Sequence, residues 1–132
     1  MNTVSEVTTS RETSPSTAAA VRRRVQVPRV DVRESSDAFQ IVADVPGVAA
    51  DGVEVTVEEN VLSVIARTSH EAPNGYRQVY GNGGPTEYRR AFHLSEKVAR
   101  EGIAATLKNG TLILQVPKAR EAQPRRISVQ AA

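Results

Sequence analysis

The chain has 132 residues, a formal net charge of +2, and neither cysteine nor tryptophan. This length fits one domain with tails, and the lack of cysteine excludes disulfide bonds and thiolate metal sites. The small net charge argues against nucleic-acid binding, because Arg22-Arg23-Arg24 is the only run of three basic residues and has no aromatic neighbour for base stacking. We interpret this run as a solvated, disordered patch.

Residues 1–28 are rich in Ser, Thr and Ala and poor in large apolar side chains. Such a segment buries too little apolar surface to offset the entropy lost on ordering, and we expect a flexible N-terminal arm. The first residues contain no apolar core of signal-peptide length, and no apolar run approaches the roughly 20 residues of a membrane-spanning helix. We therefore expect a soluble, cytoplasmic protein without a membrane partner.

From residue 29 to 118, short runs alternate apolar and polar residues. A period of two predicts strands with one buried face, and frequent turns between short strands predict an all-β, immunoglobulin-like β-sandwich. Asn109-Gly110 is the strongest hairpin signal, because a two-residue turn of the required twist needs positive φ at both positions. Glu58-Glu59-Asn60 predicts a second hairpin, and Ser95 is expected to cap one helical turn.

The segment 68–87 interrupts this pattern with several Gly and Pro residues. Long connections in compact domains are usually functional, and Gly75-Tyr76-Arg77-Gln78-Val79-Tyr80 is compatible with a strand that pairs with the sheet edge of a neighbouring subunit. It is equally compatible with a surface loop that happens to carry tyrosines. Periodicity alone does not separate these two interpretations.

Residues 119–132, at the end of the chain, are predicted to form a polar tether followed by a short apolar segment, Ile127-Ser128-Val129, which we call the plug. The alternatives are an ordinary last strand of the sandwich or a frayed tail. The spacer 119–124 is polar and ends in Pro, which favours a tether over a hairpin. We therefore expect Ile127 and Val129 to bind another molecule, most simply a second copy of the chain.

Taken in order, these motifs resemble the small heat-shock protein family, which is built on the α-crystallin domain. The resemblance covers about residues 29–129. It rests on Val45-Pro46-Gly47-Val48, Leu62-Ser63-Val64, Val116-Pro117-Lys118, Ile127-Ser128-Val129 and a signature hairpin in which Ala105, Asn109, Gly110 and Leu112 match the family pattern, with Thr111 in place of the usual Val.

The resemblance implies an ATP-independent holdase chaperone that needs no cofactor and binds partly unfolded client proteins. It implies a homodimer, built by an exchanged strand, that links into larger oligomers when the plug docks at another sandwich's edge. Arg90 matches an arginine that the family carries near its dimer interface, although the residues alone also fit solvated Arg89 and Arg90. The residues assigned to the exchanged strand are Tyr76, Arg77, Gln78, Val79 and Tyr80.

Two features depart from the family pattern. Ser95 stands where Pro is common, and the N-terminal arm lacks Phe, Trp and Leu, so that Phe39 is the first aromatic residue. Either clients bind mainly in the grooves of the sandwich, or the chain is a weaker chaperone that works with a paralogue. We expect a dimer as the firm unit and leave higher order open.

The sequence gives little support to two other functions. An enzyme is not expected, because His70 and His93 are the only histidines and no motif joins a nucleophile, a base and an orienting group. The same two distant histidines make a poor metal-ligand set. The second rival is a non-enzymatic β-sandwich co-chaperone or adaptor that does not self-assemble.

Overall fold

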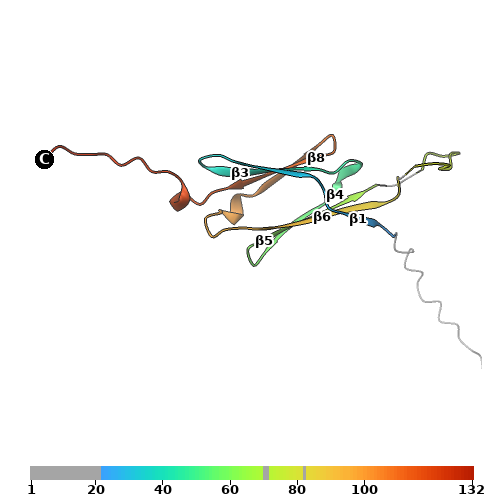
Figure 1. Ribbon diagram of the computed structural model, residues 1–132, viewed down its shortest axis with the longest axis horizontal. Coiled ribbons are helices and arrows are strands. Elements are labelled where there is room, and N and C mark those ends of the chain that lie inside the picture. The colour runs from blue at the N-terminus through green and yellow to red at the C-terminus, as the bar shows by residue number, and fades with distance from the viewer. Residues whose placement is uncertain (1–21, 70–71, 82) are drawn as a thin grey trace, which may run out of the picture.

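The computed structural model describes residues 22–69, 72–81 and 83–132, which form a sandwich of two four-stranded sheets (Figure 1). The all-β sandwich predicted from the alternating pattern is therefore confirmed. The strands and two short 3-10 helices are β1 (Arg24–Gln26), β2 (Val30–Glu34), β3 (Ala38–Asp44), β4 (Val48–Glu58), β5 (Val61–Thr68), β6 (Thr86–His93), η1 (Arg100–Gly102), β7 (Ala104–Lys108), β8 (Thr111–Pro117) and η2 (Arg120–Ala122).

One sheet has the order β1-β6-β5-β4 and the other the order β2-β3-β8-β7. All neighbouring strands are antiparallel except β1 and β6, which are parallel. β2 and β7 are the edges of one sheet, and β1 and β4 are the edges of the other. An edge strand presents unpaired N–H and C=O groups, so this topology places the free backbone groups of the sandwich along its two sides.

Alternate residues of β3, β5 and β8 fill the space between the sheets, as the period of two predicts. Leu62, Val45 and Leu114 are fully inaccessible to solvent. Burial of one such side chain stabilises the fold by about 1.5–3 kcal/mol. The buried apolar residues are Ile41, Ala43, Val45, Val48, Leu62, Val64, Ala66, Val98, Leu112, Leu114 and Val116.

The two hairpin turns have the backbone that the sequence predicts for them. Asn109 and Gly110 have φ angles of 49° and 75° between β7 and β8, and Asn60 has a φ of 66° between β4 and β5. Gly110 also accepts a hydrogen bond of 2.7 Å from the Val45 amide through its carbonyl. A Cβ at this position would lie 3.2 Å from the Pro46 Cα, so the close approach of two turns requires glycine here.

The structure differs from the sequence prediction before residue 29. We expected a flexible arm over residues 1–28; residues 1–21 lie outside the described range, but Arg24–Gln26 form β1 and pair with Thr86–Tyr88 of β6. Arg22-Arg23-Arg24 is therefore not simply a solvated patch, since Arg23 Nη1 donates a 2.7 Å hydrogen bond to the Thr68 carbonyl. Pairing with a distant edge supplies backbone hydrogen bonds that local composition does not reveal.

Candidate interaction surfaces

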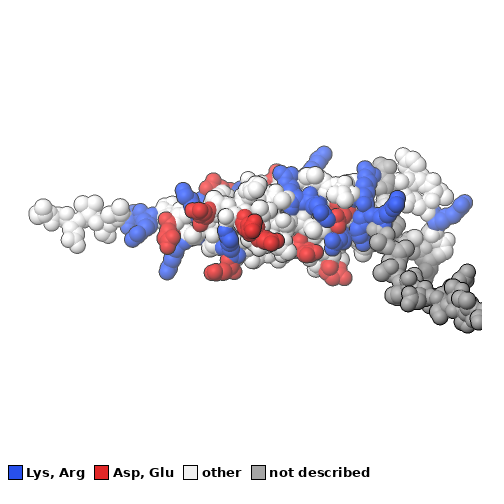
Figure 2. Space-filling view, turned by 90° about the horizontal axis from the view of Figure 1, so that it is seen from below, with Lys and Arg blue, Asp and Glu red and all other residues white. Residues whose placement is uncertain are grey.

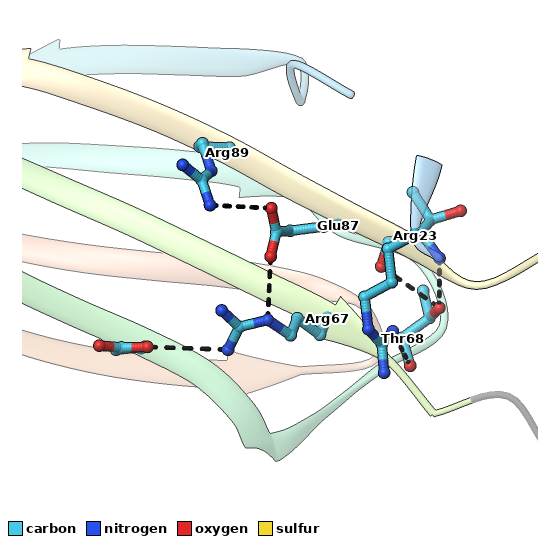
Figure 3. Close-up of polar contacts among 7 residues, drawn as sticks. Arg23, Arg67, Thr68, Glu87 and Arg89 are labelled. Atoms are coloured by element: carbon cyan, nitrogen blue, oxygen red, sulfur yellow. Dashed lines mark hydrogen bonds and ion pairs between the residues drawn. The ribbon is translucent and has the colours of Figure 1, made fainter. Parts of the chain in front are cut away.

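An ionic network joins the last part of β5 to the start of β6, at the base of the connection between them (Figure 3). Arg67 Nε donates a hydrogen bond of 2.9 Å to Glu87 Oε1, and Arg89 Nη2 lies 3.0 Å from Glu87 Oε2. Arg67 also lies 3.7 Å from Glu54 of β4. The Glu87 side chain is 10% exposed, so its charge is held by two guanidinium groups at a nearly buried position.

Burial alone would raise the pKa of Glu87, because desolvation disfavours the charged carboxylate. The hydrogen bond from Arg67 and the positive charge of Arg89 outweigh this effect, and the pKa of Glu87 is lowered below its ordinary value of 4.5. Glu87 is therefore ionised at neutral pH, and its carboxylate joins Arg67 of β5 to Arg89 of β6.

Further hydrogen bonds hold together the two ends of the connection between β5 and β6, which we call the loop. The Thr86 amide donates a 2.9 Å hydrogen bond to Thr68 Oγ1, and the Arg24 amide donates one of 2.9 Å to the Pro85 carbonyl. Together with the contact from Arg23 to Thr68, these bonds fasten both ends of the loop to β1. The loop therefore starts and ends at one fixed point of the sandwich.

The loop carries exposed apolar side chains away from that point. Tyr76, Val79 and Tyr80 are 76%, 83% and 96% exposed, and Figure 1 shows the loop extending beyond the end of the sandwich at which β1 lies. Within this single chain, the described residues 75–80 form no strand. Exposed aromatic side chains on a projecting segment fit a contact with another molecule.

One open side of the sandwich contains an apolar hollow, which we call the edge pocket. β1 covers only Thr86–Tyr88 of β6. Among the residues that the structure describes, no strand pairs with the outer edge of β2 or covers the rest of β6 on this side. The edge pocket has a volume of about 220 Å³. Its lining comes from both sheets and from the turn after β6: Val32, Phe39, Ile41, Phe92, His93, Leu94, Ser95, Val98 and Val116.

Arg90 lies on the inner face of β6, because its register partner Val64 is a buried core residue. Its guanidinium carbon stands 5.4 Å from the centre of the Phe92 ring, within cation–π distance. Phe92 lines the edge pocket, so a cation stands beside this pocket. On the other sheet, Lys118 makes a similar contact with the Phe39 ring at 5.0 Å.

A second apolar hollow lies at the opposite side, between the edges β4 and β7. This edge groove has a volume of about 270 Å³. It includes Ala105 and Leu112, which belong to the signature hairpin predicted from the sequence. Its lining is almost entirely aliphatic: Ala50, Val53, Val55, Ala105, Leu107 and Leu112.

The tail begins with an anchored turn and continues as an extended segment. The Ala119 amide donates a hydrogen bond of 2.6 Å to the Lys97 carbonyl, and Gln123 Nε2 donates one of 3.2 Å to the Lys118 carbonyl. Between them lies η2, a short 3-10 helix within the segment that the sequence predicts to be a polar tether. Beyond it, Ile127 and Val129 are 84% and 93% exposed, and Figure 1 shows the tail leaving the sandwich opposite the loop.

The face shown in Figure 2 carries acidic and basic side chains interspersed over the sandwich. Mixed charge of this kind does not form the single-sign field typical of nucleic-acid binding surfaces. Over the described ranges, no group of three His, Cys, Asp or Glu residues could hold a metal ion. In that same part of the chain, no helix has the length and apolar character needed to span a membrane.

The chain matches known proteins in both sequence and fold. The model of the Hsp20/alpha crystallin family matches residues 31–130. The chain belongs to this family. Among curated proteins, it is similar to Spore protein SP21 of Stigmatella aurantiaca, with 36% identity over 112 residues, covering 80% of this chain but 63% of that protein. A probable 15 kDa heat shock protein of Leptospira interrogans is 36% identical over 97 residues, covering 74% of each chain.

Solved structures agree with this assignment. A small heat-shock protein from Xylella fastidiosa, reported to have a distinct high-order structure, has a TM-score of 0.63 and 29% identity. The alignment covers 80% of this chain and 98% of that chain. The family resemblance stated from the motifs is therefore confirmed, and membership in the Hsp20 family supports a chaperone role.

In this Hsp20-family chain, the predicted site residues lie in separate places. The loop carries residues 75–80 beyond one end, the edge groove holds Ala105 and Leu112, and the tail carries Ile127 and Val129 at the other end. Arg90 lies apart from all three, beside the edge pocket. Sequence reasoning did not find the edge pocket, although one signal was available: Phe39 and Phe92, the only two phenylalanines, both line it.

Proposed function

We propose that this chain is an ATP-independent holdase, which binds partly unfolded proteins and keeps them from aggregating. The observation that carries the proposal is the presence of an apolar hollow beside an unpaired strand edge on both sides of the sandwich. Such a site offers an extended segment both backbone hydrogen bonds and side-chain pockets. An unfolded client is rich in extended apolar segments, so it matches this kind of surface.

The proposed working unit is an assembly of identical chains. No other described strand pairs with the outer edge of β2, and a loop segment of six residues, 75–80, has the length of an ordinary strand. We propose that this segment of one copy pairs with β2 of a second copy, and that Arg90 lies at the resulting interface. The exposed tyrosines of the loop support this arrangement, and so does the contact of Arg90 with Phe92, which lines the edge pocket together with Val32 of β2.

The tail is proposed to link such pairs. Ile127 and Val129 are two positions apart, so in an extended chain they point to the same side and present two aliphatic side chains to the edge groove of another copy. Burial of two such side chains, less the cost of ordering the tail, makes one dock weak and reversible. Several docks in one assembly reinforce each other through effective concentration, so subunits can exchange without loss of the whole.

A non-assembling adaptor is the alternative function. An adaptor would need neither an exposed aromatic loop nor an exposed aliphatic tail, and this chain has both. The two functions predict different molecular masses for the protein in solution. Light scattering coupled to size-exclusion chromatography is expected to give at least a dimer, whereas a monomer at every concentration would support the adaptor.

The direct test of the holdase proposal is suppression of aggregation. A heat-labile model client is warmed with and without the full chain, and its turbidity is followed in the absence of ATP. We expect turbidity to fall as the chain is added, with no further effect of ATP, while an inert protein at the same mass concentration leaves it unchanged. Turbidity that is unaffected at several-fold molar excess of the chain would contradict the proposal.

A further inference from the structure

The edge pocket is a mostly apolar space that opens to the surface of the sandwich. The core side chains Ile41 and Val116 form part of its wall, and Val32 of β2 stands at the mouth with 57% of its surface exposed. A cavity of about 150 Å³ lined by apolar side chains is enough to hold a benzene ring. The edge pocket, at about 220 Å³, therefore has room for one phenol ring.

We propose that the edge pocket is filled by a tyrosine ring from the loop of a second copy, from the face of that loop that carries Tyr76 and Tyr80. This inference rests on the proposed pairing of the loop with β2 and adds what anchors it. The pocket would then be an interface site, and the two loop tyrosines would be the residues that decide the strength of the dimer.

The tyrosine is assigned to a second copy because the loop of the same chain leaves the sandwich far from the edge pocket. The edge pocket includes Val98, which is bridged to Lys118 at the start of the tail. The loop leaves at the other end of the sandwich, and its base is fixed there by Arg67 and Glu87. A second copy can instead bring its loop to β2, whose outer edge pairs with no strand in the described part of the chain.

The choice of loop face follows from alternation and charge. When residues 75–80 are extended, Tyr76 and Tyr80 point to one side while Arg77 points to the other. On β2, Val32 points inward because its partner Ile41 is buried, and Asp31 therefore points outward. With the tyrosines inward, Arg77 lies on the outer face of β2, which carries both Asp31 and Arg33. A register that sets Arg77 opposite Asp31 pairs opposite charges, which stabilises cross-strand pairs.

The opposite face would be unfavourable. It would direct Arg77 into an apolar hollow whose neighbouring cation is already Arg90, and an unpaired buried charge beside a like charge is costly. The tyrosine ring instead places an aromatic surface within reach of the Arg90 guanidinium, which favours aromatic faces. His93 and Ser95, which also line the pocket, offer polar partners to a phenol hydroxyl.

Site-specific cross-linking tests the position of the ring. The chain has no cysteine, so single variants can be mixed and oxidised without background. Directly opposed residues of antiparallel strands have Cα atoms about 4.5–5.5 Å apart, within the range of about 4.4–6.8 Å found for disulfide-bonded residues. We expect Val32→Cys to form a mixed disulfide with Tyr76→Cys or Tyr80→Cys, and little with Val79→Cys. Preferential cross-linking to Val79→Cys would overturn the assigned face, and cross-linking to Ile127→Cys would assign the pocket to the tail.

Dimer dissociation constants test the energetic role of the ring. By sedimentation of the full chain, Tyr76→Ala combined with Tyr80→Ala is expected to raise the dissociation constant by about 30-fold or more, since buried aromatic rings dominate interface energies. The matched Phe substitutions keep the rings and are expected to stay within about threefold of wild type. Circular dichroism checks that each variant keeps the sandwich.

The outcomes separate the inference from the function on which it rests. A wild-type chain that is monomeric at all concentrations would overturn the proposed assembly itself. A wild-type dimer that the alanine variants leave unchanged would overturn the tyrosine anchor alone, and the edge pocket would then be open to a client segment. Suppression of client aggregation can be measured in the same variants independently of either result.

Discussion

The tail offers the clearest quantitative test of the assembly proposed for this chain. Ile127 and Val129 are 84% and 93% exposed in the single chain, so nearly their whole side chains are available for burial in the edge groove. At about 0.8 kcal/mol per buried CH₂, replacing both with Ala removes up to about 4 kcal/mol from one dock. Because about 1.4 kcal/mol corresponds to a tenfold change in Kd, each dock becomes weaker by up to roughly a thousandfold.

The assay is the mass distribution of the full chain by light scattering coupled to size-exclusion chromatography. We expect Ile127→Ala combined with Val129→Ala to abolish assemblies larger than a dimer and to leave the dimer itself intact, because the loop is at the opposite end. Ser128→Ala is the matched control, since this side chain points away from the other two in an extended tail. An unchanged mass distribution in the double variant would refute the docking of the tail.

Two further predictions concern stability. Glu87→Gln is expected to lower the free energy of unfolding. The difference from wild type is largest above about pH 5 and shrinks as the pH falls through the lowered pKa of Glu87, because the carboxylate then loses its charge. Chemical denaturation at several pH values measures this difference, and a difference that stays constant down to about pH 3 would contradict the prediction. Gly110→Ala is expected to cost more than about 1 kcal/mol, because φ is 75° and Pro46 is close. The measurement is the midpoint of urea unfolding. Gly84→Ala is the control, since a Cβ there contacts nothing within 4 Å, and equal midpoints for the two variants would contradict this prediction.

The sandwich was predictable because its signals are local. Alternation identifies the inward positions of β3, β5 and β8 directly, and the turn at Asn109-Gly110 is specified by two adjacent residues whose backbone preferences are strong. Ser95 is a partial case. Its Oγ accepts a hydrogen bond of 3.2 Å from the Lys97 amide, as expected of a cap, but the residues that follow form a turn and not a helix. In each case the decisive interaction lies within a few residues of the pattern that predicts it.

The parts that sequence reasoning missed depend on contacts between distant segments. β1 forms because Arg24–Gln26 meets the edge of β6, some sixty residues later in the chain, and its own composition favours no structure. The pairing of Arg67 with Glu87 follows from the β5–β6 register, which a single sequence does not fix. The edge pocket likewise exists only because β1 ends early and leaves β6 uncovered beside β2.

The placement of the loop and the tail at opposite ends of the sandwich has a geometric consequence. A mutual exchange of loops is isologous and is complete after two chains, whereas a tail that inserts into the next molecule is a heterologous contact, which repeats until the rotation closes. In the proposed assembly, the direction of the tail decides whether that repetition ends in a finite ring or shell or runs on as a filament. The tail starts from η2, which is held by the hydrogen bonds from Ala119 to Lys97 and from Gln123 to Lys118. One short turn would therefore govern the architecture of the whole particle.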